Sequence, residues 1–194
     1  IQRAICLATI VVGIVITKQT HKMTDYPVGY NTRNIISVMG DDYKKYIGEL
    51  SQMHFVEKVG IASNSFIRHV YPQELHGINW VPLRMDQNAF DMLGIKVKEY
   101  LELSGVSLQN AYTTEKGLQL AASLNMSAWE NKYIGVLEDV HFGSVKEISS
   151  ENTIFDIVIK DDYSQYFRGN ILIKVSGDQG EAKEQIRKFF MEKG

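Results

Sequence analysis

The residues of this sequence that come closest to a chemical pair are Asp139 and His141, within the stretch YIGVLEDVHFGSVKEI at residues 133–148. Residues two apart on an extended strand point to the same face of a sheet, so this carboxylate and imidazole would stand side by side. Such a pair could move a proton in catalysis or bind a metal. The sequence shows no third residue that would complete a catalytic or metal site with this pair, neither a nucleophile nor a further metal ligand. We therefore favour a structural interpretation, in which Asp139 accepts backbone N–H groups where the strand bends and His141 packs beside Phe142.

No other pattern is typical of a catalytic or cofactor site. The chain has five scattered histidines: His21, His54, His69, His76 and His141. They form no H-x-x-H or H-E-x-x-H pattern, and the sequence has no phosphate-binding G-x-x-x-x-G-K-[ST] loop and no G-x-S-x-G elbow. Two acidic pairs, Asp41–Asp42 and Asp161–Asp162, fall at the ends of predicted elements, where capping and turns explain them. We therefore predict no catalytic, cofactor-binding or metal-ligating residues, and no ATP binding by this chain itself.

The composition narrows the class of protein further. The chain has 194 residues, with 23 acidic residues against 21 lysines and arginines and a net charge of -2. This balance lacks the basic footprint of a nucleic-acid-binding protein, so we expect no nucleic-acid partner. A single cysteine, Cys6, excludes a disulfide framework within the chain and a thiolate metal cluster. The length suits one large domain or two small subdomains.

The N-terminus carries an uncharged run, AICLATIVVGIVIT, at residues 4–17, followed by the polar stretch KQTHK. The run could be the core of a signal peptide, a buried β-rich segment or part of a transmembrane helix. It is shorter than the roughly 20 residues that span a bilayer, and the chain starts at Ile1 rather than at Met. We therefore expect residues 1–17 to be a partial transmembrane helix and residues 18–194 to be an extracytoplasmic domain.

The pattern after residue 34 predicts an α+β fold. A strand at 35–38, a helix capped by Asp41 or Asp42, and a strand at 55–62 form a split β-α-β opening. Asp86 and Gly94 are placed to cap the two ends of a short helix. Pro82 predicts an edge or a bulge for the strand at 78–85. The remaining predicted elements are a strand near 95–103, a helix from Thr113 or Thr114 to Asn125, strands at 132–140, 153–161 and 169–177, and a final helix capped by Asp178.

Taken with its surroundings, YIGVLEDVHFGSVKEI resembles the stretch VIGVVKDFHFxSLHxxI of MacB-like periplasmic core domains in FtsX-type ABC transporter permeases. The matching residues are Ile134, Gly135, Val136, Asp139, His141, Phe142 and Ser144. In this setting Asp139 and His141 look like part of a strand-and-turn signature.

Other stretches resemble the same family in the same order. The family's exit from a membrane helix is matched by Gln19, Met23, Gly29, Tyr30, Asn31 and Asn34. Its fxxxLGI pattern is matched by Phe90, Leu93, Gly94 and Ile95. Asn110 weakly matches a third pattern, and GNILIKVSGDQGEAKEQIRKFF resembles the closing strand and helix. The chain departs from the family pattern at two places. EYLEL at residues 99–103 stands where the family has GRxF after its fxxxLGI pattern, and Ala111 stands where the family has an acidic residue.

The resemblance implies a porter-like β-α-β subdomain with an inserted second subdomain, preceded by part of a transmembrane helix. It also implies a non-enzymatic role in the periplasm at a bacterial inner membrane. ATP would be hydrolysed by a separate ABC ATPase subunit or domain, and the partner would be a periplasmic substrate, an adaptor or another protein. The alternative is a membrane-anchored periplasmic sensor or ligand-binding module, which predicts a concave pocket with convergent polar groups.

Overall fold

The computed structural model describes residues 14, 18, 29–40, 44–63, 73–75, 78–102, 110–123, 133–138, 140, 153–159 and 169–193. The elements in chain order are β1 (Ile35–Gly40), α2 (Lys44–Leu50), β2 (Val56–Ser63), β3 (Gln73–Leu75), β4 (Ile78–Met85), α3 (Gln87–Leu93), β5 (Val97–Tyr100), β6 (Asn110–Thr114), α4 (Glu115–Ser123), β7 (Tyr133–Leu137), β8 (Thr153–Ile159), β9 (Gly169–Val175) and α6 (Gln179–Lys193).

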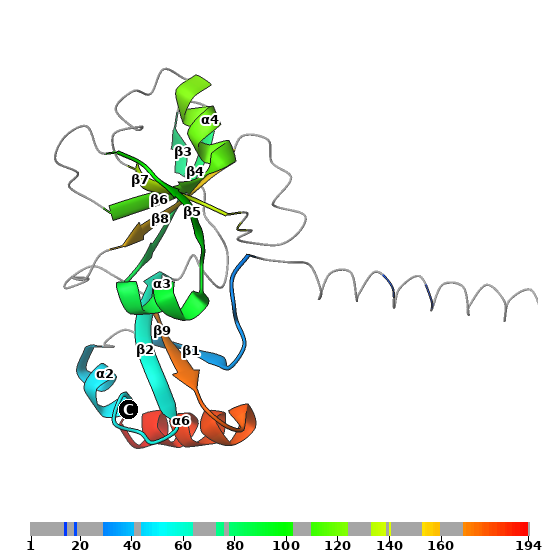
Figure 1. Ribbon diagram of the computed structural model, residues 1–194. Coiled ribbons are helices and arrows are strands. Elements are labelled where there is room, and N and C mark those ends of the chain that lie inside the picture. Colours follow the sequence, from blue (N-terminus) through cyan, green and yellow to red (C-terminus); the bar gives the residue numbers. More distant parts are fainter. Residues whose placement is uncertain are drawn as a thin grey trace, which may run out of the picture.

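The strands form one mixed nine-stranded sheet with the order β1-β9-β2-β4-β8-β6-β7-β5, and β3 pairs with β4 beside this path. The sheet has two parts, shown one above the other in Figure 1. The porter-like part holds β1, β9, β2, α2 and α6. The inserted part runs from β3 to β8 and enters the chain between β2 and β9. The predicted α+β fold, with a split β-α-β part and an insertion, is therefore confirmed.

The porter-like part is built around β9, which lies antiparallel between β1 and β2. Helices α2 and α6 cover one face of this small sheet with a core that includes Leu50, Ile171, Ile173 and Ile186. Leu172 points to the opposite face and joins a second core with α3. Since neighbouring residues of a strand face opposite sides, β9 needs apolar residues at nearly every position.

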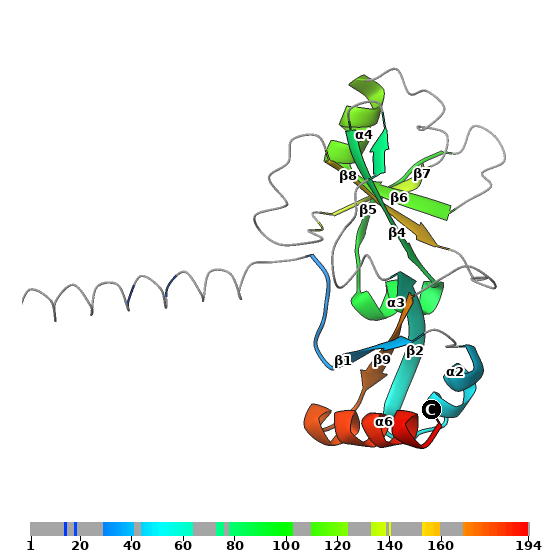
Figure 2. The ribbon, with the colours of Figure 1, turned by 180° about the vertical axis from the view of Figure 1, so that it is seen from behind.

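Helix α3 lies between the two parts of the sheet (Figures 1 and 2). Three residues of β2 at alternate positions face it: Lys58, Gly60 and Ala62. A Cβ atom on Gly60 would lie 2.5 Å from the backbone nitrogen of Ala89, so only glycine allows α3 to approach β2 this closely. The backbone N–H of Asp86 also donates to the carbonyl of Ile61 in β2 at 3.0 Å.

The apolar side of α3 packs on the inserted part. Ala89, Phe90, Met92 and Leu93 are buried in α3. They share a core with residues of β4 and β8, including Val81, Leu83, Met85 and Ile157, and with Ala62 and Leu172 of the porter-like part. One hydrophobic core therefore extends from α3 into both parts of the chain.

Two sequence predictions differ from the fold. Strand β6 was not predicted, and Thr113 and Thr114 lie in it, so that α4 begins at Glu115. Pro82 is predicted to lie at an edge or a bulge, and β4 is instead an inner strand that pairs in parallel with β8, with no described ladder partner for Pro82 on its other side. On its other side, β4 pairs with β3 at residues 78–80 and with β2 at Met85. Pro82 falls between these two contacts.

The predicted membrane helix at residues 1–17 lies outside the described residues except for Ile14, which is helical. Within the described part of the chain, no helix combines the length and apolarity needed to cross a membrane.

We expect Gly60→Ala to destabilise the protein by about 1–3 kcal/mol, because the added methyl group forces α3 away from β2. Gly48→Ala is the matched control, since nothing lies within 4 Å of a Cβ at Gly48 in α2. The control should gain about 0.5–1 kcal/mol from the higher helix propensity of alanine. Urea unfolding measures both changes, and equal stability of the two variants would contradict this account of the α3–β2 contact.

Candidate functional site

A pocket of about 590 Å³, which we call the junction pocket, opens beside the C-terminal end of α3. Its lining comes from segments that are far apart in the sequence: Gly29, Tyr30 and Asn31 before β1, Gly94 and Lys96 after α3, Lys98 in β5, Glu115 in α4, and Leu137 and Glu138 at the end of β7. Residues from three of the family-like motifs therefore lie around one pocket.

The segment before β1, residues 29–34, is held in a defined turn, and we call it the strap. Gly29 and Asn34 have positive φ angles of 76° and 60°, which glycine and asparagine adopt most readily. Between them, the side-chain oxygen of Asn31 accepts a hydrogen bond from the backbone N–H of Arg33 at 2.8 Å. The backbone N–H of Asn31 donates to the carbonyl of Leu93 at 2.6 Å. Glycine and asparagine in the GYNTRN stretch thus have local structural roles.

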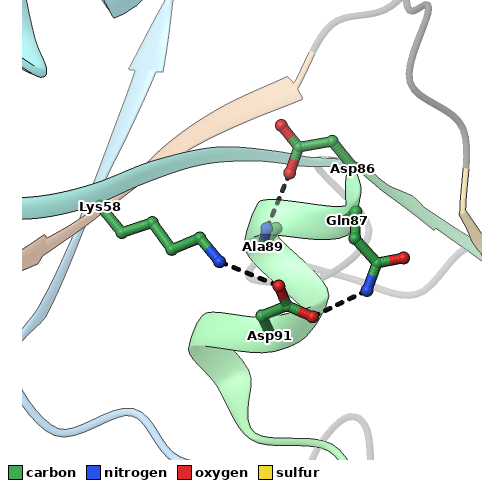
Figure 3. Close-up of polar contacts among 5 residues, drawn as sticks. All are labelled: Lys58, Asp86, Gln87, Ala89 and Asp91. Atoms are coloured by element: carbon green, nitrogen blue, oxygen red, sulfur yellow. Dashed lines mark hydrogen bonds and ion pairs between the residues drawn. The ribbon is translucent and has the colours of Figure 1, made fainter.

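Both predicted caps of α3 are confirmed. Asp86 accepts a hydrogen bond from the backbone N–H of Ala89 at 2.7 Å, as Figure 3 shows. Gly94 has a left-handed conformation with φ 59°, and its N–H donates to the carbonyl of Asp91. This turn ends the helix and leaves the carbonyl of Leu93 to accept the N–H of Asn31.

A polar network joins α3 to β2 on the outer side of the helix (Figure 3). The Lys58 ammonium group lies 2.9 Å from Oδ2 of Asp91, and the Gln87 amide donates to Oδ1 of Asp91 at 2.7 Å. The hydrogen bond from Lys58, and then that from Gln87, hold the pKa of Asp91 below its ordinary value. Because the two charged side chains are 36% and 47% exposed, we assign this ion pair only about 0.2–1 kcal/mol.

The charged residues of the junction pocket are paired. Lys98 contacts Glu115 at 2.7 Å, and Lys96 lies 3.9 Å from Glu138. The hydrogen bond and charge of Lys98 lower the pKa of Glu115. The pocket lining therefore carries two ammonium–carboxylate pairs. Such a lining suits a polar or zwitterionic ligand better than a ligand of one charge.

Two phenols lie at the pocket and in the core behind it. Burial raises the pKa of Tyr30, and burial is also the main cause of the raised pKa of Tyr112. Both phenols stay protonated at neutral pH and can act as donors rather than as bases. Tyr112 stacks on Phe90 of α3 with ring centroids 5.2 Å apart. Tyr30 is the phenol that lines the pocket, and Tyr112 belongs to the core that Tyr30 packs against.

Asp139 and His141, for which the sequence favours a structural role over a chemical one, lie outside the described residues. The described part of β7 ends at Leu137, and Glu138 lines the junction pocket. Val140, between the pair, is buried in the core beside α3. Close packing explains why glycine stands at position 135 of the same motif, because a Cβ there would lie 2.9 Å from the carbonyl oxygen of Glu99.

The structure also contains a buried carboxylate that the sequence analysis missed. Asp156 of β8 is 3% exposed and accepts hydrogen bonds from Trp80 Nε1 at 2.6 Å and from the Tyr133 hydroxyl at 2.8 and 2.9 Å. Burial, and then the negative charge of Asp156, raise the pKa of Tyr133 well above its usual range. An aspartate inside the apolar strand TIFDIVI is the signal that could have indicated this site.

The described residues include no group of three or more histidine, cysteine, aspartate or glutamate side chains placed to hold a metal ion. Of the five histidines, only His54 is described, and its ring lies edge-on to Phe55.

The sequence matches no protein-family model and no curated protein. The fold is similar to the crystal structure of the periplasmic region of MacB from Actinobacillus actinomycetemcomitans, with 15% identity, 88% of each chain covered and a TM-score of 0.46. It is also similar to the extracellular domain of the ABC-type transporter YknZ from Gram-positive bacteria, with 14% identity, 75% of this chain and 78% of that chain covered, and a TM-score of 0.43.

We expect Tyr133→Phe to destabilise the protein by about 1.5–3 kcal/mol, because the buried carboxylate of Asp156 loses a hydrogen-bond donor. The control is Tyr100→Phe on the exposed edge strand β5, where the side chain is 72% exposed. That control should change stability by less than about 0.5 kcal/mol. Chemical denaturation of both variants tests this, and an effect of Tyr133→Phe as small as that of the control would count against the buried network.

We expect Asp91→Asn to lower stability by about 0.2–1 kcal/mol at pH 7, with a difference that disappears in acid. The lowered pKa of Asp91 means that its contribution is present above the ordinary value of about 4 and is lost as the pH falls through the value in the folded protein. Urea unfolding of the wild type and the variant across pH 2.5–7, as a rough range, measures this difference. A difference that stays constant down to the lowest pH would rule out the Lys58–Asp91 ion pair as its source.

Proposed function

We propose that residues 18–194 form the extracytoplasmic domain of an ABC transporter permease in a bacterial inner membrane, and that residues 1–17 belong to a membrane helix. In this proposal a separate nucleotide-binding subunit or domain hydrolyses ATP. The domain described above transmits the resulting conformational change to a periplasmic substrate or to a partner protein such as an adaptor.

The observation that supports this proposal most is the convergence of the motifs. Strap residues Gly29 and Asn31 and helix-end residues Leu93 and Gly94 come from separate family-like motifs, and they meet through the Asn31–Leu93 hydrogen bond. Leu137 and Glu138 of the YIGVLEDVHFGSVKEI motif line the same pocket. Segments that carry three of the family-like motifs therefore meet at the junction pocket, and two of them are joined by the Asn31–Leu93 hydrogen bond.

The chemistry of the described residues also suits a mechanical role. The charges at the junction pocket are neutralised in pairs, and the polar network of Lys58, Gln87 and Asp91 fixes a helix rather than a substrate. A domain that transmits movement needs stiff contacts between its parts, and packed side chains with interlocking hydrogen bonds supply them.

The alternative of a periplasmic ligand-binding module has one observation in its favour, the junction pocket itself. Its volume of about 590 Å³ lies in the range of small-molecule sites. Its lysines, however, lie 2.7 and 3.9 Å from carboxylates, so the pocket offers a ligand charges that are already paired.

Cysteine labelling of the full-length protein in spheroplasts tests the proposed location. In a Cys6→Ser background, we expect Met191→Cys to react with a membrane-impermeant maleimide, because Met191 is 72% exposed on α6. Leu50→Cys is the matched control, since Leu50 is fully buried and should react only after unfolding. Labelling of Met191→Cys only after cell lysis would place α6 in the cytoplasm and contradict the proposal.

A further inference from the structure

We propose that the strap, residues 29–34, is the mechanical link through which movement of the chain before Gly29 reaches the inserted part, and that it acts through α3. This inference rests on the proposed function and names the route of coupling within it. The strap joins β1 at Ile35, so the chain could instead pull only on the porter-like part. The contacts of the strap decide between these two routes.

The strap is bonded to both parts of the molecule. At its centre, the backbone N–H of Asn31 donates to Leu93 at the end of α3, at 2.6 Å. At its end, the carbonyl of Asn34 accepts the backbone N–H of Val175 in β9, at 2.9 Å. The strap therefore ties α3 to the central strand of the porter-like part. Half-buried Tyr30 adds an apolar contact with the core beneath α3.

The strap is also stiff for so short a segment. Its two left-handed residues, Gly29 and Asn34, bracket a turn in which the N–H of Ile35 donates to the carbonyl of Thr32 at 3.3 Å. The Asn31 side chain bonds within the same turn. A segment with fixed dihedral angles passes on a displacement that a flexible linker would absorb.

Helix α3 holds both parts of the sheet, so a displacement of its end reaches both. On the porter-like side, Ala89 meets Gly60, and Asp91 pairs with Lys58 (Figure 3). On the inserted side, Phe90 stacks on Tyr112 of β6 with an angle of 19° between the rings.

The direct connection between the two parts of the sheet is narrow by comparison. Strands β2 and β4 share one described ladder pair, Ala62 with Met85. The backbone N–H of Arg84 adds a bond to the Ser63 hydroxyl at 3.2 Å, and that of Asp86, directly after β4, donates to the carbonyl of Ile61 at 3.0 Å. Because few described bonds join β2 to β4 directly, we assign the coupling between the two parts to α3 and the strap.

Hydrogen exchange in the full-length protein tests whether the strap supports α3. We expect Tyr30→Ala to speed exchange of the α3 amides about tenfold more than exchange of the β9 amides, because α3 loses the packing of the strap. The matched control is Tyr46→Ala, which removes another half-buried tyrosine, one that packs edge-on against Phe189 and Phe190 in α6. An unchanged α3, or an equal effect of the two variants on α3, would overturn the proposal.

A disulfide staple tests whether the strap stays docked during the working cycle. A Cβ on Gly94 would lie 4.0 Å from the Cβ of Asn31, within the roughly 3.5–4.5 Å that disulfides require. We expect Asn31→Cys with Gly94→Cys, in a Cys6→Ser background, to complement a strain lacking the gene equally well whether the bond is oxidised or reduced. Gly94→Cys alone controls for strain at the left-handed position.

Failure of the proposed link and failure of the proposed function would give different results. Loss of complementation on oxidation, with recovery in dithiothreitol, would show that the strap must undock and would overturn the link. Absence of any ATP-dependent activity in the unmodified full-length protein, assayed together with its nucleotide-binding subunit, would overturn the proposed function. The exchange measurement tests the strap in either case.

Discussion

The contact between helix α3 and strand β2 is the constraint on which the arrangement of this protein depends. Gly60 lets the backbone of Ala89 come so close that a single methyl group would not fit. That approach places the apolar side of α3 over Ala62 and Leu172 and lets one core continue into the inserted part. Because β2 and β4 share a single described ladder pair, the relative position of the two parts follows from this helix more than from the sheet.

The family-like motifs gain a common physical meaning from this arrangement. Gly94 ends α3 in a left-handed turn that leaves Leu93 to accept the strap, and Asn31 supplies the N–H. Gly135 lets β7 pack closely on β5 and Tyr112. Gly94 is needed for its left-handed conformation and Gly135 for its small size, and the side chain of Asn31 accepts a hydrogen bond within the strap.

Helix caps, which depend on neighbouring residues, could be predicted from the sequence, whereas contacts between residues far apart in the chain could not. Asp86, Gly94 and Asp178 were predicted as caps because a cap depends on residues a few positions away, and Asp178 accepts the N–H of Glu181 at 2.8 Å. Strand β6 was missed because NAYTT has no clear alternation and gains its stability from β7 and β8. The bonds of Asp156 to Trp80 and Tyr133, and of Asn31 to Leu93, join residues that only the tertiary fold brings together.

The central claim is that α3 and the strap hold the two parts as one body, and a distance measurement tests it most directly. Spin labels would be placed on exposed residues Gln119 of α4 and Lys188 of α6, one in each part of the full-length protein. With the proposed nucleotide-binding subunit assembled on the labelled protein, electron–electron double resonance would then give the distance without nucleotide and in the vanadate-trapped state. The account predicts one narrow distance that is the same in both states. A broad distribution, or a distance that shifts between the two states, would contradict it.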